Sequence, residues 1–206
     1  MIHATSDTHP IRVDVVPTPG LPGRLGLTFA PGKNAPSETA RVHWLRDAET
    51  DLNALRKRHG TDVLVALLRP YEYDLLGIPH LIPQAHRHGM TVRRFEIADR
   101  TVPHAALSDT FDATIDEVCD DLRAGRTVTV FCRGGLGRSG LVAACVLVRL
   151  GEKPAHAIAR VRSARPGAVE TREQERYVEA YADRIGVGRA ASRGAVTERR
   201  RSLIGA

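Results

Sequence analysis

A thiol, two guanidinium groups and three glycines fall within the seven residues from Cys132 to Arg138. Backbone amides and a nearby guanidinium both favour the thiolate form of a cysteine, which is the nucleophilic form. The planar fork of Arg138 can hold two oxygens of a phosphate at once. Ser139 follows directly and can donate a hydrogen bond to the sulfur when the sulfur becomes a leaving group. These residue types at this spacing are suited to displacement at phosphorus through a phosphocysteine.

The segments on either side predict how these residues are held. Val128–Phe131 is short and rich in β-branched residues, which indicates a buried strand. Leu141–Val148 is an apolar run with good helix formers, which indicates a buried helix. Cys132–Gly140 is then a strand-to-helix loop, where amides and a helix N-terminus converge to form an anion site. We expect consecutive loop residues to bind the phosphate: Arg133, Gly134, Gly135, Leu136, Gly137 and Arg138.

The loop resembles the phosphate-binding loop of a known enzyme family. Cys-x5-Arg-Ser between a strand and a helix is similar to the motif of the cysteine-dependent dual-specificity protein phosphatases. The variant Cys-x-Gly-Gly-Leu-Gly-Arg-Ser, followed by Leu-Val-Ala-Ala-Cys, is most similar to their kinase-associated phosphatase (cyclin-dependent kinase inhibitor 3-like) branch. The resemblance covers roughly residues 24 to 186. The chain departs from the pattern at Phe131, where the family usually has a histidine that helps to set the thiolate network.

A phosphatase of this kind also needs an acid, because displacement from a phosphate ester expels an alkoxide that must be protonated. Asp99 lies in Ile97-Ala98-Asp99, after an expected strand, and in the similar phosphatases Ile-Ala-Asp at this place carries the general acid. Asp109 and Asp112 are competing candidates. Asp99 as a simple turn residue is the other interpretation, since Asp is common in turns.

The start of the last expected helix contains a further candidate. Thr171 and Gln174 have the spacing of a capping box. In related phosphatases, a Gln-Thr-x-x-Gln segment here helps to place the water that hydrolyses the phosphocysteine. This chain keeps only Gln174 of the two glutamines, and Glu170 replaces the first. Capping alone also explains Thr171 and Gln174.

Strands alternate with helices along the rest of the chain, which predicts an α/β fold. We expect a single domain with a central, mostly parallel sheet flanked by helices, as in protein tyrosine phosphatases. The other expected strands are Ile11–Val16, Arg24–Phe29, Arg41–Leu45, Thr61–Leu68 and Thr91–Ile97. Further helices are expected from the N-cap Asp47 to Gly60, over Pro79–His88, from the N-cap Ser108 or Asp109 to Gly125, and over Pro154–Arg162. Ala30–Ala40 is expected to be a loop.

Composition limits the classes of protein that the chain can belong to. The net charge is +6 and nearly all cations are arginines, which favours anionic substrates; we consider nucleic acid an unlikely partner. No apolar run is long enough to span a membrane. Three cysteines and an N-terminus without a secretory pattern predict a cytoplasmic protein. We expect an N-terminal arm over residues 1–23, the phosphatase-like domain over 24–186 and a basic tail over 187–206.

The expected function is hydrolysis of phosphotyrosine and phosphoserine or phosphothreonine in proteins, with a kinase as one candidate substrate and with no cofactor or metal. Shallow rim segments, Arg69–Asp74 and Ala98–Pro103, favour this dual specificity. Leu136 argues against phosphoinositides, because similar phosphoinositide phosphatases tend to have lysine there. A non-catalytic phosphate-binding module, an RNA 5′-phosphatase and a sulfur transferase of the rhodanese kind remain as alternatives.

Overall fold

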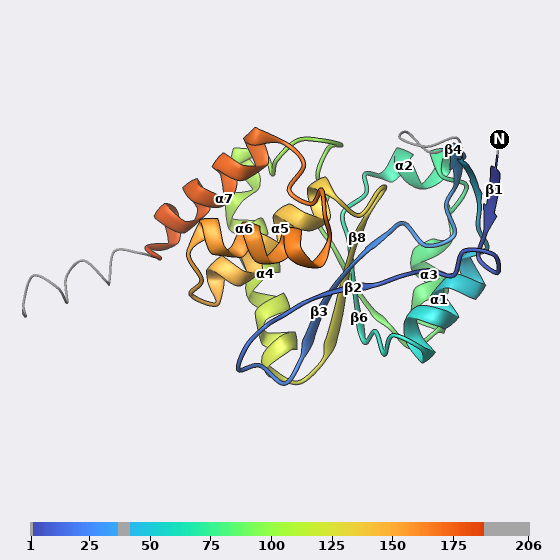
Figure 1. Ribbon diagram of the computed structural model, residues 1–206, viewed down its shortest axis with the longest axis horizontal. Coiled ribbons are helices and arrows are strands. Elements are labelled where there is room, and N and C mark those ends of the chain that lie inside the picture. Colours follow the sequence, from blue (N-terminus) through green and yellow to red (C-terminus); the bar gives the residue numbers. More distant parts are fainter. Residues whose placement is uncertain (1, 37–41, 188–206) are drawn as a thin grey trace, which may run out of the picture.

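A five-stranded sheet forms the centre of the computed structural model, which describes residues 2–36 and 42–187 (Figure 1). The strand order is β2-β3-β8-β6-β7, and all neighbouring pairs are parallel except β2 with β3. The α/β fold with a mostly parallel sheet is thus confirmed. The strands are β2 (Asp14–Val16), β3 (Arg24–Phe29), β6 (Val63–Ala66), β7 (Thr91–Arg94) and β8 (Thr127–Cys132).

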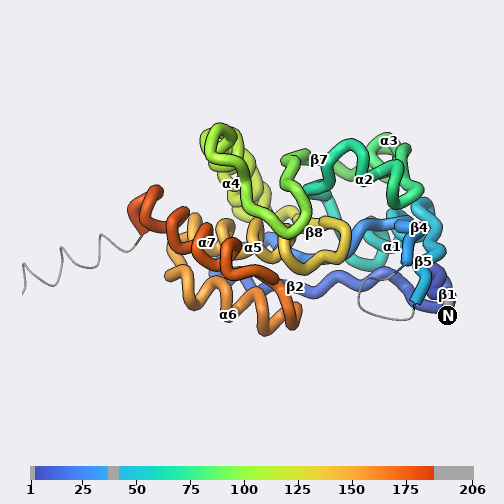
Figure 2. The backbone as a smooth tube through the Cα atoms, turned by 90° about the horizontal axis from the view of Figure 1, so that it is seen from above, coloured from blue at the N-terminus to red at the C-terminus, as the bar shows by residue number. Residues whose placement is uncertain are grey.

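Helices cover both faces of this sheet, and Figure 2 shows the two layers from above. Successive side chains of a strand point to opposite faces. Val63 and Val65 of β6 therefore join one core, whereas Leu64 and Ala66 join the other. The helices of the first face are α4 (Ser108–Arg123), α5 (Gly137–Arg149), α6 (Pro154–Ala164) and α7 (Arg172–Ile185). Those of the second are α1 (Ala48–Lys57), α2 (Pro70–Leu75) and α3 (Leu81–Arg87).

The junction of β8 and α5 differs from the expected nine-residue loop. Cys132 is the last residue of β8 and α5 begins at Gly137, so Arg138 and Ser139 belong to the first turn of the helix. Every residue of α5 from Gly137 to Val148 is buried. From Leu141 to Val148 this helix is apolar all round, because it is enclosed between the sheet and the other helices of its layer.

A small second sheet was not predicted. Its strands are β1 (Ile2–Thr5), β5 (Val42–Leu45) and β4 (Asn34–Pro36), in the order β1-β5-β4. The expectation that Ala30–Ala40 is entirely a loop is wrong for Asn34–Pro36, a strand too short and too proline-rich to give a sequence signal. The N-terminal segment contributes β1 to this sheet and β2 to the central one. The predicted tail lies outside the described residues from 188 onward.

The predicted helix starts are partly right. Asp47 caps α1, and its Oδ1 accepts a hydrogen bond from Thr50 N at 2.7 Å. The Ser108 or Asp109 cap is wrong, because a short 3₁₀ turn, η1 (Ala105–Leu107), runs directly into α4 and puts Leu107 at the cap. The Ser108 hydroxyl instead donates to Ala105 O at 2.8 Å.

Candidate active site

The turn after β8 curls around the Cys132 sulfur. Cys132 is 3% exposed, and its Sγ accepts a hydrogen bond from Gly135 N at 3.2 Å. Gly135 has φ +72°, and a Cβ there would lie 2.4 Å from Thr28 O, so no other residue fits without moving β3. The sulfur therefore accepts a hydrogen bond from a turn amide just before the N-terminus of α5, a place where amide and helix dipoles favour negative charge.

Arg138 lies fully buried beside this turn, with 1% of its surface exposed. Its Nη1 and Nη2 donate to the two carboxylate oxygens of Glu72 at 2.7 and 2.9 Å, and Nη1 also donates to Ile97 O at 3.1 Å. The second fork of the guanidinium is made by Nε and the other hydrogen of Nη2. Among the residues that the structure describes, Nε is buried without a hydrogen-bond partner, and Nη2 contacts Asp99 Oδ1 at 2.7 Å. This second fork is the one that can receive two phosphate oxygens.

Glu72 fixes Arg138, a role that no sequence motif predicted. Glu72 belongs to α2 and is 2% exposed; its Oε2 also accepts a hydrogen bond from Arg69 N at 2.9 Å. Burial would lower the pKa of Arg138, but the hydrogen bonds to Glu72 and the charges of Cys132 and Asp99 raise it instead, so the side chain stays cationic. The segment Arg69–Asp74, expected near the pocket rim, thus contributes this buried carboxylate.

The loop after β7 brings Asp99 into the same place. Asp99 lines a cleft together with Cys132, and its side chain is 38% exposed. A turn bends the loop here: Thr101 Oγ1 donates to Ala98 O at 2.9 Å and Arg100 has φ +60°. The competing aspartates lie elsewhere, since Asp109 and Asp112 are in α4 and are not among the described residues that line the cleft.

Phe131 precedes Cys132 in the sequence and Ser139 follows it, and the two differ in whether they can donate a hydrogen bond to its sulfur. The Ser139 hydroxyl is fully buried and has no hydrogen-bond partner within the described structure. Phe131 is also fully buried, but its ring belongs to the core on the opposite face of the sheet from Cys132. Phe131 therefore contributes no hydrogen bond to the sulfur, whereas Ser139 keeps an unused donor.

Gln174 reaches the start of α5 while it caps α7. The capping box is confirmed: Thr171 Oγ1 accepts from Gln174 N at 3.2 Å, and Gln174 Oε1 accepts from the backbone of Glu170 and Thr171. Gln174 Nε2 donates to Thr101 O at 3.1 Å, which ties α7 to the Asp99 loop. A Cβ at Gly137 would lie 3.0 Å from both Gln174 Nε2 and Glu170 Oε2, so both side chains border the phosphate-binding turn.

One wall of the cleft consists of residues that the sequence motifs did not predict. It encloses about 240 Å³, less than the ~300–1,000 Å³ of typical ligand pockets, which suits a phosphorylated side chain. Phe29, Lys33 and Trp44 form one side, and Arg165 lies on the rim. All four come from segments distant in sequence from the turn, and only β3 pairing with β8 brings Phe29 opposite Cys132.

Among residues 2–36 and 42–187, no three His, Cys, Asp or Glu side chains are grouped so that they could hold a metal ion. In the same part of the chain, each helix is too short or too polar to cross a membrane.

Comparison with known proteins gives independent evidence for the resemblance to phosphatases. A family model described as "Polymorphic toxin system, DSP-PTPase phosphatase" matches residues 40–152. Cyclin-dependent kinase inhibitor 3 of Sus scrofa is 32% identical over 143 residues, which cover 68% of this chain and 66% of that protein. The Homo sapiens protein of the same name is 30% identical with the same coverage. The matched region thus spans slightly less than two thirds of these relatives.

A solved structure has the same fold. The crystal structure of kinase-associated phosphatase, with its catalytic-site cysteine replaced by serine, matches with a TM-score of 0.75 at 26% identity. The alignment covers 86% of this chain and 97% of that one. These matches confirm the resemblance that the loop motif indicated.

Proposed function

The chain belongs to the DSP-PTPase phosphatase family, and we propose that it is a cysteine-dependent protein phosphatase that acts through a phosphocysteine. The observation that carries this proposal is the hydrogen bond from Gly135 N to the Cys132 sulfur, in a turn that leads to Arg138, whose buried Nε has no hydrogen-bond partner among the described residues. Release of phosphate from para-nitrophenyl phosphate tests it. Binding of a phosphopeptide without turnover would instead support the non-catalytic module.

The first step forms the phosphocysteine. The Cys132 thiolate attacks phosphorus, the bond from phosphorus to the substrate oxygen breaks, and Asp99 gives its proton to that oxygen. The backbone amides from Arg133 to Arg138 and the second fork of Arg138 hold the three equatorial oxygens as the charge moves. Asp99 lies 2.7 Å from Arg138 Nη2, so it must leave this fork when phosphate enters, and it then lies next to the departing oxygen.

The second step releases phosphate. A water molecule attacks phosphorus, Asp99 takes a proton from that water, and the bond between sulfur and phosphorus breaks to return the Cys132 thiolate. Ser139 donates its unused hydroxyl hydrogen to the departing sulfur. Gln174, which borders Gly137, helps to position the water. No metal takes part in these steps, because the turn itself supplies the positive field.

The proposed substrates are phosphoproteins, with a kinase as one candidate. One relative is a kinase-associated phosphatase and another is a cyclin-dependent kinase inhibitor, which supports this suggestion. We infer a cytoplasmic location, since all three cysteines are free thiols, as expected in a reducing compartment.

Replacing Asp99 should separate good from poor leaving groups. We expect Asp99→Ala to slow hydrolysis of alkyl phosphates by about 10²–10⁴-fold, and of aryl phosphates by less, because a phenolate needs little protonation. In the pH profile of kcat/KM the basic limb should flatten and the acid limb should stay. Asp109→Ala is the matched control in α4. If Asp109→Ala shows this pattern and Asp99→Ala does not, the assignment of the acid is wrong.

Dual specificity predicts similar rates on two classes of peptide. The rim segments Arg69–Asp74 and Ala98–Pro103 are short and should leave the cleft shallow, so phosphothreonine should reach the sulfur as phosphotyrosine does. Arg100, on the cleft, and Arg69, at the start of α2, would contact acidic flanking residues. Kinetics on matched phosphotyrosine and phosphothreonine peptides measure this. A preference for phosphotyrosine beyond roughly 10³-fold, about 4 kcal/mol, would contradict it.

A further inference from the structure

The turn between β3 and β4 carries an ammonium group into the wall of the cleft. Lys33 is 8% exposed, and its Nζ donates to Arg133 O at 3.5 Å, a long hydrogen bond. The same Nζ lies 4.5 Å from the centre of the Phe29 ring and 4.7 Å from that of Trp44. Within the described residues these contacts include no carboxylate. A buried cation is costly unless an anion lies near it.

The register of the central sheet identifies the anion. Phe29 of β3 is the cross-strand partner of Cys132 in β8, and Arg133 is the next residue in the chain. Lys33 contacts both of these residues, so it lies near the nucleophile. Lys33 and Cys132 also line the same cleft. The Cys132 thiolate is therefore a negative charge that the chain can place in the same cleft as this ammonium, and its charge acts on Lys33.

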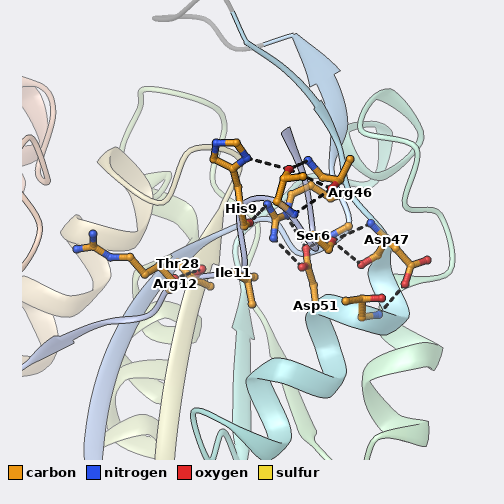
Figure 3. Close-up of polar contacts among 12 residues, drawn as sticks. Ser6, His9, Ile11, Arg12, Thr28, Arg46, Asp47 and Asp51 are labelled. Atoms are coloured by element: carbon orange, nitrogen blue, oxygen red, sulfur yellow. Dashed lines mark hydrogen bonds and ion pairs between the residues drawn. The ribbon is translucent and has the colours of Figure 1, made fainter. Parts of the chain in front are cut away.

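A buried ion pair holds the turn in position. The Arg46 guanidinium and the Asp51 carboxylate face each other (Figure 3), with Nε to Oδ2 and Nη2 to Oδ1 distances of 2.7 Å. Asp51 Oδ2 also accepts a hydrogen bond from Gly32 N at 2.9 Å, and Arg46 N donates to Lys33 O at 3.3 Å. Hydrogen bonds thus hold the backbone on both sides of the Lys33 Cα, so the fold itself directs the Lys33 side chain into the cleft.

The charges around Lys33 change its pKa in opposite directions. Burial, followed by the Arg46 charge, lowers the pKa of Lys33 to about 8, with smaller contributions from Arg165 and Arg133, whereas the charge of Cys132 opposes this fall. At neutral pH the side chain is therefore still mostly an ammonium. The Arg46 and Arg165 charges are offset by ion pairs with Asp51 and Asp14. Asp99 and Glu170 line the same cleft, and Asp99 Oδ1 lies 2.7 Å from Arg138 Nη2.

We propose that Lys33 is a positioning residue whose ammonium stabilises the Cys132 thiolate from the β3 side of the cleft, where Phe131 offers no hydrogen bond. The role rests on the proposed function, because the thiolate is the nucleophile of that reaction. It places one determinant of nucleophile reactivity on a turn about a hundred residues before the phosphate-binding loop.

Alkylation of Cys132 tests this without relying on turnover. The rate of reaction with iodoacetamide, followed by mass spectrometry of the Cys132 peptide from pH 4.5 to 9, reports the thiolate fraction. Lys33→Met should move the midpoint of this profile upward by about one pH unit, in line with the effect of a neighbouring opposite charge. The rate below the midpoint should then fall about tenfold. Lys33→Arg should stay near wild type.

The same pH profile of Cys132 alkylation also provides a control variant. Lys57→Met removes an exposed lysine at the end of α1 and should leave the midpoint unchanged. A folded Lys33→Met variant whose midpoint stays within about 0.3 pH units of wild type would overturn the proposal. A shifted midpoint in a protein that never hydrolyses phosphate would support the role of Lys33 and reject the phosphatase function instead.

A second measurement covers the case in which Lys33→Met does not fold. The chain has only three lysines, Lys33, Lys57 and Lys153, so labelled lysine carbons give a simple NMR spectrum. Coupling between two sites is reciprocal. Cys132→Ser, which removes the thiolate, should therefore lower the Lys33 titration midpoint relative to wild type. Equal midpoints in the two proteins would show that the charges are not coupled, and the proposal would fail.

Discussion

Cys132→Ser is expected to reduce kcat on para-nitrophenyl phosphate by at least roughly 10⁴-fold, because the covalent step loses its nucleophile. A serine hydroxyl is too weakly acidic to ionise where the thiol does. Binding should survive, since the turn amides and Arg138 remain in place, and titration calorimetry with a phosphopeptide should measure it. Activity within tenfold of wild type would exclude the phosphocysteine.

The other cysteines supply matched controls for this variant. Cys119 and Cys145 are fully buried in α4 and α5, and burial raises the pKa of Cys119 to about 12 and that of Cys145 further still. Both therefore remain thiols at neutral pH and take no part in the proposed reaction. Cys119→Ala and Cys145→Ala should keep kcat near wild type, although each leaves a small cavity in the core.

Local sequence signals predicted the reactive turn because its parts lie within a few residues of one another. Val128–Phe131 is short and rich in β-branched residues, whereas the longer apolar run after Gly140 contains good helix formers, which indicates a strand and a helix. The capping box of Thr171 and Gln174 is equally local and is confirmed. The predicted start of α5 was wrong because the glycines of Cys132–Gly140 indicated a loop, whereas Gly140 is a helical position where a Cβ would lie only 2.5 Å from Val169 N.

Residues that act across the fold gave no such signal. Glu72 is 66 positions from Arg138, and in the sequence it looks like an ordinary acidic residue at the start of a helix. Lys33 likewise belongs to a turn whose direction depends on the pair of Arg46 and Asp51. Such contacts are made by tertiary structure, and a single sequence carries no periodicity or spacing that reports them.

The contact of Arg138 with Glu72 explains why the guanidinium can act as a fixed cradle. Truncating one partner of a buried ion pair leaves the other unpaired, which is strongly destabilising. With Glu72 on the first fork, Arg138 cannot rotate, and its second fork is held toward the cleft. Binding to phosphate then requires no reorganisation of the guanidinium, which is the condition under which such donors contribute most to the rate.

Arg138→Lys should therefore lower kcat/KM by at least about 10²–10³-fold, the loss typical when one donor to a developing oxyanion is removed. Lysine keeps the charge but has no planar fork, so it cannot bind Glu72 and two phosphate oxygens together. Steady-state kinetics on para-nitrophenyl phosphate measure the loss. Arg149→Lys is the matched control, since Arg149 is in the same helix and pairs with Asp116 at the surface.

Binding separates a catalytic loss from a folding defect in this variant. In a Cys132→Ser background, Arg138→Lys should weaken phosphopeptide affinity about tenfold or more, since a hydrogen bond to a charged group contributes about 1.5–3 kcal/mol. Glu72→Gln, which keeps the shape and one acceptor, should give a smaller loss in both assays because Arg138 is still held on one side. Wild-type kcat/KM in a folded Arg138→Lys protein would mean that the second fork of Arg138 does not hold the phosphate.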